Sequence, residues 1–168
     1  MRPRPTHLLA FALMLAASAP TLAKEEATFT SPSLTPEAAL AAAQAALQAC
    51  QKAGFNTAVA VADRSGVTQV MIRDRFAGAH TPQTAMGKAW TAASFRTNTT
   101  DLVAQTQPGS ASYGIRALPG VVMLGGGMLI ESHGKLVGTI GVSGAPSGAE
   151  DDRCAKAGID AIIESLEF

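Results

Sequence analysis

The sequence predicts an α/β fold of the α+β type, in which helices pack against an antiparallel sheet. Two segments, residues 57–74 and 128–143, each contain two short apolar strands joined by a turn, which is the pattern of a β-hairpin. Segments with helical spacing of apolar residues precede, separate and follow these hairpins. Because no internal repeat divides the chain, we expect these elements to form one domain.

The first 23 residues are expected to be a secretory signal peptide. Two arginines lie within the first four residues, and the apolar run at 8–19 is too short to span a bilayer. Small residues at 21–23 suit cleavage after Ala23; the alternative is an uncleaved anchor. We therefore expect a periplasmic or secreted protein with no membrane contact after cleavage, a flexible arm at 24–34 and a domain at 35–168.

The remaining chain of about 145 residues is long enough to bury a real core. The formal net charge of the full chain is zero and the chain has no basic stripe, so nucleic acid is not expected as a partner. Only 15% of the residues are charged, whereas 47% are apolar. This low charge predicts that other subunits cover part of the surface in a homo-oligomer, a dimer or larger.

The first helix is expected to begin after Thr35 and to run to about Ala53. The Thr35 hydroxyl suits a helix cap, Pro36 suits the first helical position and Gly54 suits the end. Helical spacing points Cys50 inward, whether or not it is bonded.

The first hairpin follows this helix. Residues 57–62 are apolar on both faces, as expected of a central strand, whereas residues 67–74 alternate, as expected of a strand with one solvated face. The turn between them lies at 63–66.

The second helix is expected to start at Thr81-Pro82, by the same pattern of cap and proline. Its main apolar face consists of Met86, Ala89, Trp90 and Ala93. Lys88 and Phe95 fall on roughly the opposite side. Because a helix that is apolar on more than one side is usually covered twice, we expect a neighbouring subunit or a ligand as the second cover.

The second half of the chain is expected to hold a short helical turn at 98–107, a strand at 121–124, the second hairpin with His133-Gly134 as its turn, and a last helix at 149–166. The returning strand of that hairpin carries one glycine on each face, Gly138 and Gly141. Glycine weakens a strand, so this pattern indicates the close approach of another element or a ligand.

Four motifs carry a resemblance to a known family: VAVADRSG at 59–66, AMGKAWTA at 85–92, Gly126-Gly127 with GKLVGTIGVSGA at 134–145, and an aspartate followed by CAKAGI at 154–159. Together they resemble the GlcG/HbpS family of haem-binding or haem-degrading proteins, related to the C-terminal domain of PduO-type proteins. The resemblance covers about Leu34 to Phe168. It implies a profilin-like fold with about five antiparallel strands, helices on both faces, and assembly into dimers or larger oligomers.

The resemblance also implies haem or iron as the cofactor. Haem needs an apolar slot, cations near its propionates and an axial ligand. We expect His80, in the loop before the second helix, to be the metal ligand, with Arg73, Arg75 and Lys88 as neighbouring cations and Met86 in the lining. The alternative for His80 is an ordinary loop histidine, and His133 is expected to be a solvated turn residue.

Two further groups have open interpretations. Lys88 matches the family motif and is expected either to contact an anion or propionate, or to bond strand-end carbonyls as a structural lysine. Ser143 and Gly144 begin a loop of small residues whose backbone N–H groups suit an anion before the last helix. Asp151 and Asp152 in the first turn of that helix would repel such an anion, so a plain capped loop is the alternative.

The fold implied by the resemblance lets the first and last helices pack together, so Cys50 and Cys154 can form a disulfide; two buried thiols are the alternative. The expected function is that of an exported haem-binding protein with a small-molecule ligand. One alternative is an enzyme, for haem degradation or a small-molecule conversion, with a pocket at Lys88. Another is a structural or sensor partner without a ligand. No histidine neighbours Ser143 in the sequence, so a hydrolase is not expected. The three-histidine and Cys/His patterns of zinc sites are also missing.

Overall fold

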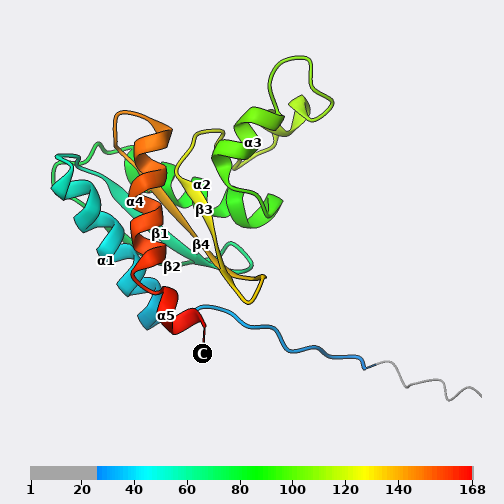
Figure 1. Cartoon of the computed structure of the whole chain (residues 1–168). Helices are drawn as coiled ribbons and strands as arrows, with labels where there is room; N and C mark the ends of the chain where they lie inside the picture. The colour runs from blue at the N-terminus through cyan, green and yellow to red at the C-terminus, as the bar shows by residue number, and fades with distance from the viewer. Residues whose placement is uncertain (1–25, 168) are drawn as a thin grey trace, which may run out of the picture. The chain divides into compact units, whose positions relative to one another are not determined.

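The computed structural model describes residues 26–167 (Figure 1). Residues 26–30 have no regular secondary structure, and residues 31–167 form a compact unit. Its elements are α1 (Pro36–Lys52), β1 (Ala58–Asp63), β2 (Thr68–Arg73), α2 (Thr81–Phe95), α3 (Thr99–Gln105), the 3₁₀ helix η1 (Tyr113–Ala117), β3 (Gly127–Ser132), β4 (Lys135–Ser143), α4 (Gly148–Asp160) and α5 (Ile163–Leu166). The expected signal peptide lies outside the described residues. Within 26–167, no helix has the length and apolar character needed to cross a membrane.

The four strands form one antiparallel sheet in the order β2-β1-β4-β3. The predicted α+β class is confirmed, and β1 is the buried inner strand that its sequence indicated. The sheet has four strands and not about five, because residues 121–124 form no strand. That segment lies against α2, where the backbone N–H of Val122 donates to Thr91 Oγ1 at 2.9 Å.

Helices cover both faces of the sheet (Figure 1). On one face α1 and α4 pack on the larger core, which includes Val59, Val61, Ile140 and Val142. On the other face α2 packs against Ala58 and Ala60 of β1. A disulfide between Cys50 and Cys154 joins α1 to α4.

Glycines in β4 allow close packing on both faces, as the sequence predicted. A Cβ atom on Gly141 would lie 2.1 Å from the carbonyl oxygen of Ala85, so α2 approaches the sheet at this point. A Cβ atom on Gly138 would lie 2.4 Å from the side chain of Leu34 on the other face. Leu34 is buried and its N–H donates to Val137 O at 2.9 Å, which attaches the end of the expected arm to β4.

The predicted orientation of α2 was wrong for Lys88 and Trp90, whereas Ala89 and Ala93 of the predicted apolar face are buried. Lys88 is buried together with Ala85, Ala89 and Ala92, whereas Trp90 is 38% exposed. The alanines form a narrow face that fits the sheet, and the long Lys88 side chain reaches polar partners beyond them. Part of the second cover comes from the chain itself, because Val122 lies over Gly87, where a Cβ atom would be 2.5 Å from its Cγ2.

Three local details can be compared with the prediction, and the first two differ from it whereas the third agrees. The cap of α2 is His80, so Thr81 is the first helical residue. The last helix ends at Asp160, and the short α5 follows it, in place of one helix to residue 166. His133 and Gly134 both have positive φ, 49° and 71°, as the predicted two-residue turn requires.

Candidate functional site

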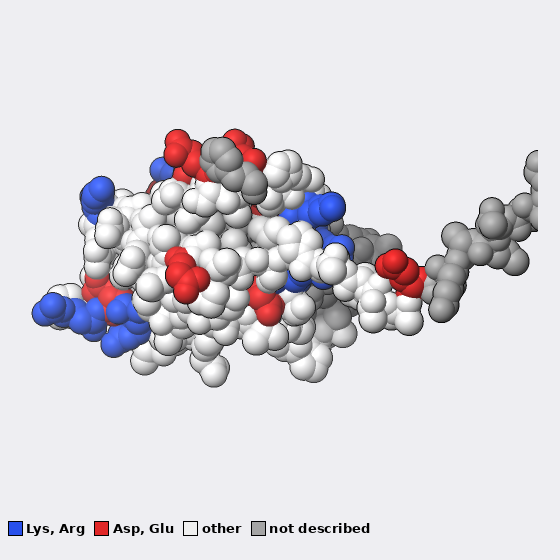
Figure 2. Space-filling model, turned by 90° about the horizontal axis from the view of Figure 1, so that it is seen from below, with Lys and Arg blue, Asp and Glu red and all other residues white. Residues whose placement is uncertain are grey.

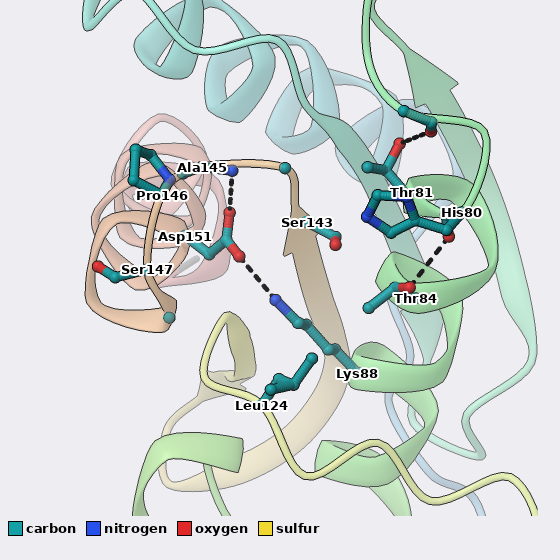
Figure 3. Close-up of a pocket in the computed structure, with 13 residues that line it drawn as sticks. His80, Thr81, Thr84, Lys88, Leu124, Ser143, Ala145, Pro146, Ser147 and Asp151 are labelled. Carbon is teal, nitrogen blue, oxygen red and sulfur yellow. Dashed lines mark hydrogen bonds and ion pairs between the residues drawn. The ribbon is translucent and has the colours of Figure 1, made fainter.

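A pocket of about 360 Å³ lies between the start of α2 and the loop that joins β4 to α4 (Figure 3). Its lining comes from three parts of the chain: Gly78, His80, Thr81, Thr84 and Lys88; Leu124; and Ser143, Gly144, Ala145, Pro146, Ser147, Gly148 and Asp151. The volume is at the low end of the range for small-molecule pockets.

Hydroxyl groups hold the turn that presents His80. Thr81 Oγ1 donates to Gly78 O at 2.8 Å, and Thr84 Oγ1 donates to His80 O at 3.0 Å. The His80 side chain is exposed at the pocket rim. In Figure 3 it lies across the pocket from Asp151 and Pro146.

The opposite wall is the turn between β4 and α4. Gly144 has a φ of +129°, a conformation that glycine adopts without steric cost, and it redirects the chain at the end of β4. Ser147 then caps α4, because its Oγ accepts from the N–H of Glu150 at 3.3 Å. The sequence therefore places the N-terminal end of α4 at the pocket.

A buried ion pair forms the base of this wall. Lys88 Nζ lies 2.7 Å from Asp151 Oδ2 and donates to Val142 O at 2.8 Å. Asp151 Oδ1 accepts from the N–H of Ala145 at 3.0 Å. Burial raises the pKa of Asp151, while the hydrogen bond and charge of Lys88 act in the opposite direction.

Of the two aspartates expected in the first turn of α4, only Asp151 lies there, and the two have different roles. Asp152 accepts from Gly126 N at 2.6 Å and from Thr100 Oγ1, and it does not line the pocket. Asp151 does line it, but Lys88 matches its charge. Of the two charges expected to repel an anion, that of Asp151 is therefore matched by Lys88, whereas Asp152 is held by two neutral donors.

Four of the predicted site residues meet at this pocket: His80, Lys88, Ser143 and Gly144. Arg73, Arg75 and Met86 do not line it. Arg73 donates to Ala77 O, Arg75 lies 5.7 Å from the centre of the Phe76 ring, and Met86 packs beside Ala58 and Ala60. Of the two proposed roles of Lys88, the contact with a strand-end carbonyl is present in the structure.

Sequence reasoning did not assign Thr84, Leu124 or the Lys88–Asp151 pair to the site. Thr84 lies one helical turn after His80, so that spacing was available in the sequence. The pair joins residues 63 positions apart, and nothing local indicates it. Within residues 26–167, no three His, Cys, Asp or Glu side chains gather to hold a metal ion.

Comparisons with known proteins place this geometry in a family. The crystal structure of a double mutant of Streptomyces reticuli HbpS is 38% identical, with a TM-score of 0.77, and the match covers 87% of this chain and 98% of that one. The crystal structure of a PduOC–haem complex is 32% identical, with a TM-score of 0.73, and the match covers 77% and 95%.

The corrinoid adenosyltransferase PduO of Salmonella typhimurium is 36% identical over 121 residues, which are 71% of this chain. The match covers only 36% of that enzyme, so the chain corresponds to about a third of it. The family model for haem-degrading proteins of the HbpS type matches residues 34–160. The chain therefore belongs to the HbpS-like family.

Proposed function

We propose that this protein binds haem at the pocket beside His80. The observation that carries the proposal is an imidazole at the rim of a pocket in a chain whose relative, PduOC, has been crystallised with haem. A histidine nitrogen is a common axial ligand of haem iron. His80 would hold the iron, and the bound haem would supply the redox and ligand chemistry of that iron.

The lining fits one edge of a haem group. Leu124 and Pro146 give an apolar rim, while the inner end of the pocket is polar. Because about 360 Å³ is small for a large planar ligand, haem would enter by one edge and leave the rest of its plane at the open side. Neither Arg73 nor Arg75 reaches the lining, so they are not part of this proposal.

A haem titration followed by absorption spectroscopy tests the proposal. We expect added haemin to give a saturable Soret shift, and His80→Asn to weaken binding by about tenfold or more and alter the band. The matched control is His133→Asn, which changes the exposed turn histidine and keeps a residue type that tolerates positive φ. No saturable shift, or equal behaviour of the two variants, would contradict haem binding or the role of His80 respectively.

The enzyme alternative needs a reactive Lys88. In this structure Lys88 is held by Asp151 and Val142 O, an arrangement that supports a positioning role over a free amine. We therefore propose binding as the function, and haem turnover as the second candidate because the family model is that of haem-degrading proteins. Loss of the Soret band under aerobic conditions with a reductant would favour the second candidate.

Export to the periplasm or outside the cell is part of the proposal. The N-terminal sequence pattern supports it, and so does the Cys50–Cys154 disulfide, since disulfides persist mainly in oxidising compartments. The mass of the protein purified from its own host tests this, with loss of the first 23 residues as the expected result.

Self-association is also proposed. Figure 2 shows a face on which large uncharged areas separate small groups of charged residues. Leu118 and Leu124 lie on either side of Val122, which bonds to α2, and both are at least half exposed. Light scattering would test for a dimer or larger species.

A further inference from the structure

We propose that the inner end of the pocket is a subsite for a carboxylate group, bound by the Ser143 hydroxyl and the Lys88 ammonium beside the N-terminal end of α4. The inference rests on the proposed function only in that it concerns the same pocket. It adds a ligand chemistry and two binding residues to the proposed role of His80.

Ser143 is the first observation. The residue is 5% exposed, it lines the pocket, and no hydrogen bond joins its hydroxyl to another of the described residues. In Figure 3 its side chain lies between the Lys88–Asp151 pair and His80. The Ser143 oxygen is not among the buried atoms without a partner, so it is open to the pocket and available to a ligand atom.

Lys88 is the second observation. An ammonium group has three N–H donors. Within residues 26–167, Lys88 uses two of them, toward Asp151 Oδ2 and Val142 O. Its side chain is 2% exposed, so bulk water does not readily supply the third partner.

Several polar groups around the pocket already have hydrogen-bond partners. Both carboxylate oxygens of Asp151 accept hydrogen bonds, one from Lys88 and one from the N–H of Ala145. The hydroxyls of Thr81 and Thr84 donate to backbone carbonyls. The hydroxyls of Thr81 and Thr84 therefore have no donor left, and the donors that remain are the Ser143 hydroxyl and the third N–H of Lys88, which a ligand with acceptor oxygens would satisfy.

Charge decides which acceptor group fits. Gly148, the first residue of the 13-residue helix α4, lines the pocket, and the N-terminal end of a helix favours a negative group. Asp151 is close, so a dianionic phosphate would meet more repulsion than a monoanion. A carboxylate carries one charge and two acceptor oxygens in a plane, which matches the two donors, Ser143 and Lys88.

Acetate and its neutral analogue acetamide test the subsite on the full folded protein. In ¹H–¹⁵N NMR titrations we expect acetate to cause saturable shifts at the Ser143 and Gly148 amides, and acetamide to bind at least about tenfold more weakly. Ser143→Ala should weaken acetate binding by about tenfold, the effect of losing one hydrogen bond to a charged group. Ser112→Ala, at an exposed residue outside the pocket, should leave it unchanged.

Non-saturable shifts, equal binding of acetamide, or equal effects of the two serine variants would overturn the proposal. Urea denaturation of both variants checks that they are folded.

Haemin and haemin dimethyl ester then distinguish the sources of the carboxylate. Preference for haemin that disappears in Ser143→Ala identifies a propionate, whereas acetate binding without that preference identifies a small carboxylic acid. If haemin does not bind but acetate does, haem binding fails and the subsite stands.

Discussion

Lys88 Nζ and Asp151 Oδ2 are 2.7 Å apart, and the two side chains are 2% and 5% exposed. Their contact connects α2, on one face of the sheet, to α4, on the other. The same ammonium also bonds Val142 O near the end of β4, so one side chain joins three elements at the pocket. The pair thus belongs to the fold and to the site at once.

Replacing Lys88 by Met should lower the free energy of unfolding by about 3–5 kcal/mol, because it leaves the Asp151 carboxylate buried without its partner. Urea denaturation measures this. The control is Lys156→Met, which breaks the exposed pair with Asp160 and should cost less than about 1 kcal/mol. The double variant Lys88→Met/Asp151→Leu should recover much of the loss. Equal losses for Lys88→Met and Lys156→Met would contradict the importance of the buried pair.

Asp151 should also give stability a characteristic pH dependence. Its pKa is raised in the folded state, chiefly by burial. A carboxyl with a raised pKa contributes stability that is complete below the unfolded pKa, about 3.9, and lost as pH rises through the folded pKa. The unfolding free energy of the wild type minus that of Asp151→Asn should therefore fall with rising pH from about 3 upward. If this difference rises with pH instead, the effect of Lys88, which lowers the pKa of Asp151, outweighs the effect of burial.

Asp74 should show the opposite sign. Its pKa is lowered because the carboxylate accepts from the Phe76 N–H at 3.0 Å and from Gln51 Nε2 at 2.6 Å. This contribution is present above the unfolded pKa, about 3.9, and is lost as pH falls through the lower folded value. The advantage of the wild type over Asp74→Asn should thus shrink on acidification in urea denaturation series. A constant difference between pH 5 and 2 would contradict it.

Local sequence signals predicted much of the fold. Thr35-Pro36 and Gly54 bound α1, and His133-Gly134 form the predicted turn, because caps and tight turns depend on a few adjacent residues. The segment 121–124 has an apolar pattern typical of a strand, but whether it pairs depends on a sheet edge elsewhere in the chain. It bonds Thr91 of α2 instead.

Local signals in the sequence also indicated part of the candidate site. His80 and Ser143 were found because the residue types and their positions at element ends suit ligand binding. Lys88 was assigned to the wrong side of α2, since helical periodicity places a charged residue away from the core unless a buried partner exists. That partner, Asp151, lies in another helix, so only the tertiary structure identifies it.

The Cys50–Cys154 disulfide should contribute about 4–5 kcal/mol, the chain-entropy value for a loop of about 100 residues. The bond spans 104 positions, and both cysteines are buried. Reductant should therefore have little effect on the folded protein but should lower the urea midpoint once unfolding exposes the bond. The Cys50→Ala/Cys154→Ala variant, in which reductant should change nothing, is the control. An unchanged wild-type midpoint under reduction would show that the bond adds no stability.

Gly141 should be among the least replaceable residues of β4. A Cβ atom there would lie 2.1 Å from Ala85 O and 2.7 Å from Ala89 N, and both are backbone atoms of α2 that cannot rotate away. Gly141→Ala should therefore push α2 from the sheet and lower the unfolding free energy by about 3 kcal/mol or more. Gly114→Ala is the control, because no atom lies within 4 Å of its Cβ position, and it should change stability by no more than about 0.5 kcal/mol. Since Lys88 lies on the same helix, the Gly141 variant should also weaken acetate binding at Ser143, which the NMR titration measures. Wild-type stability of Gly141→Ala would contradict the close contact between α2 and β4.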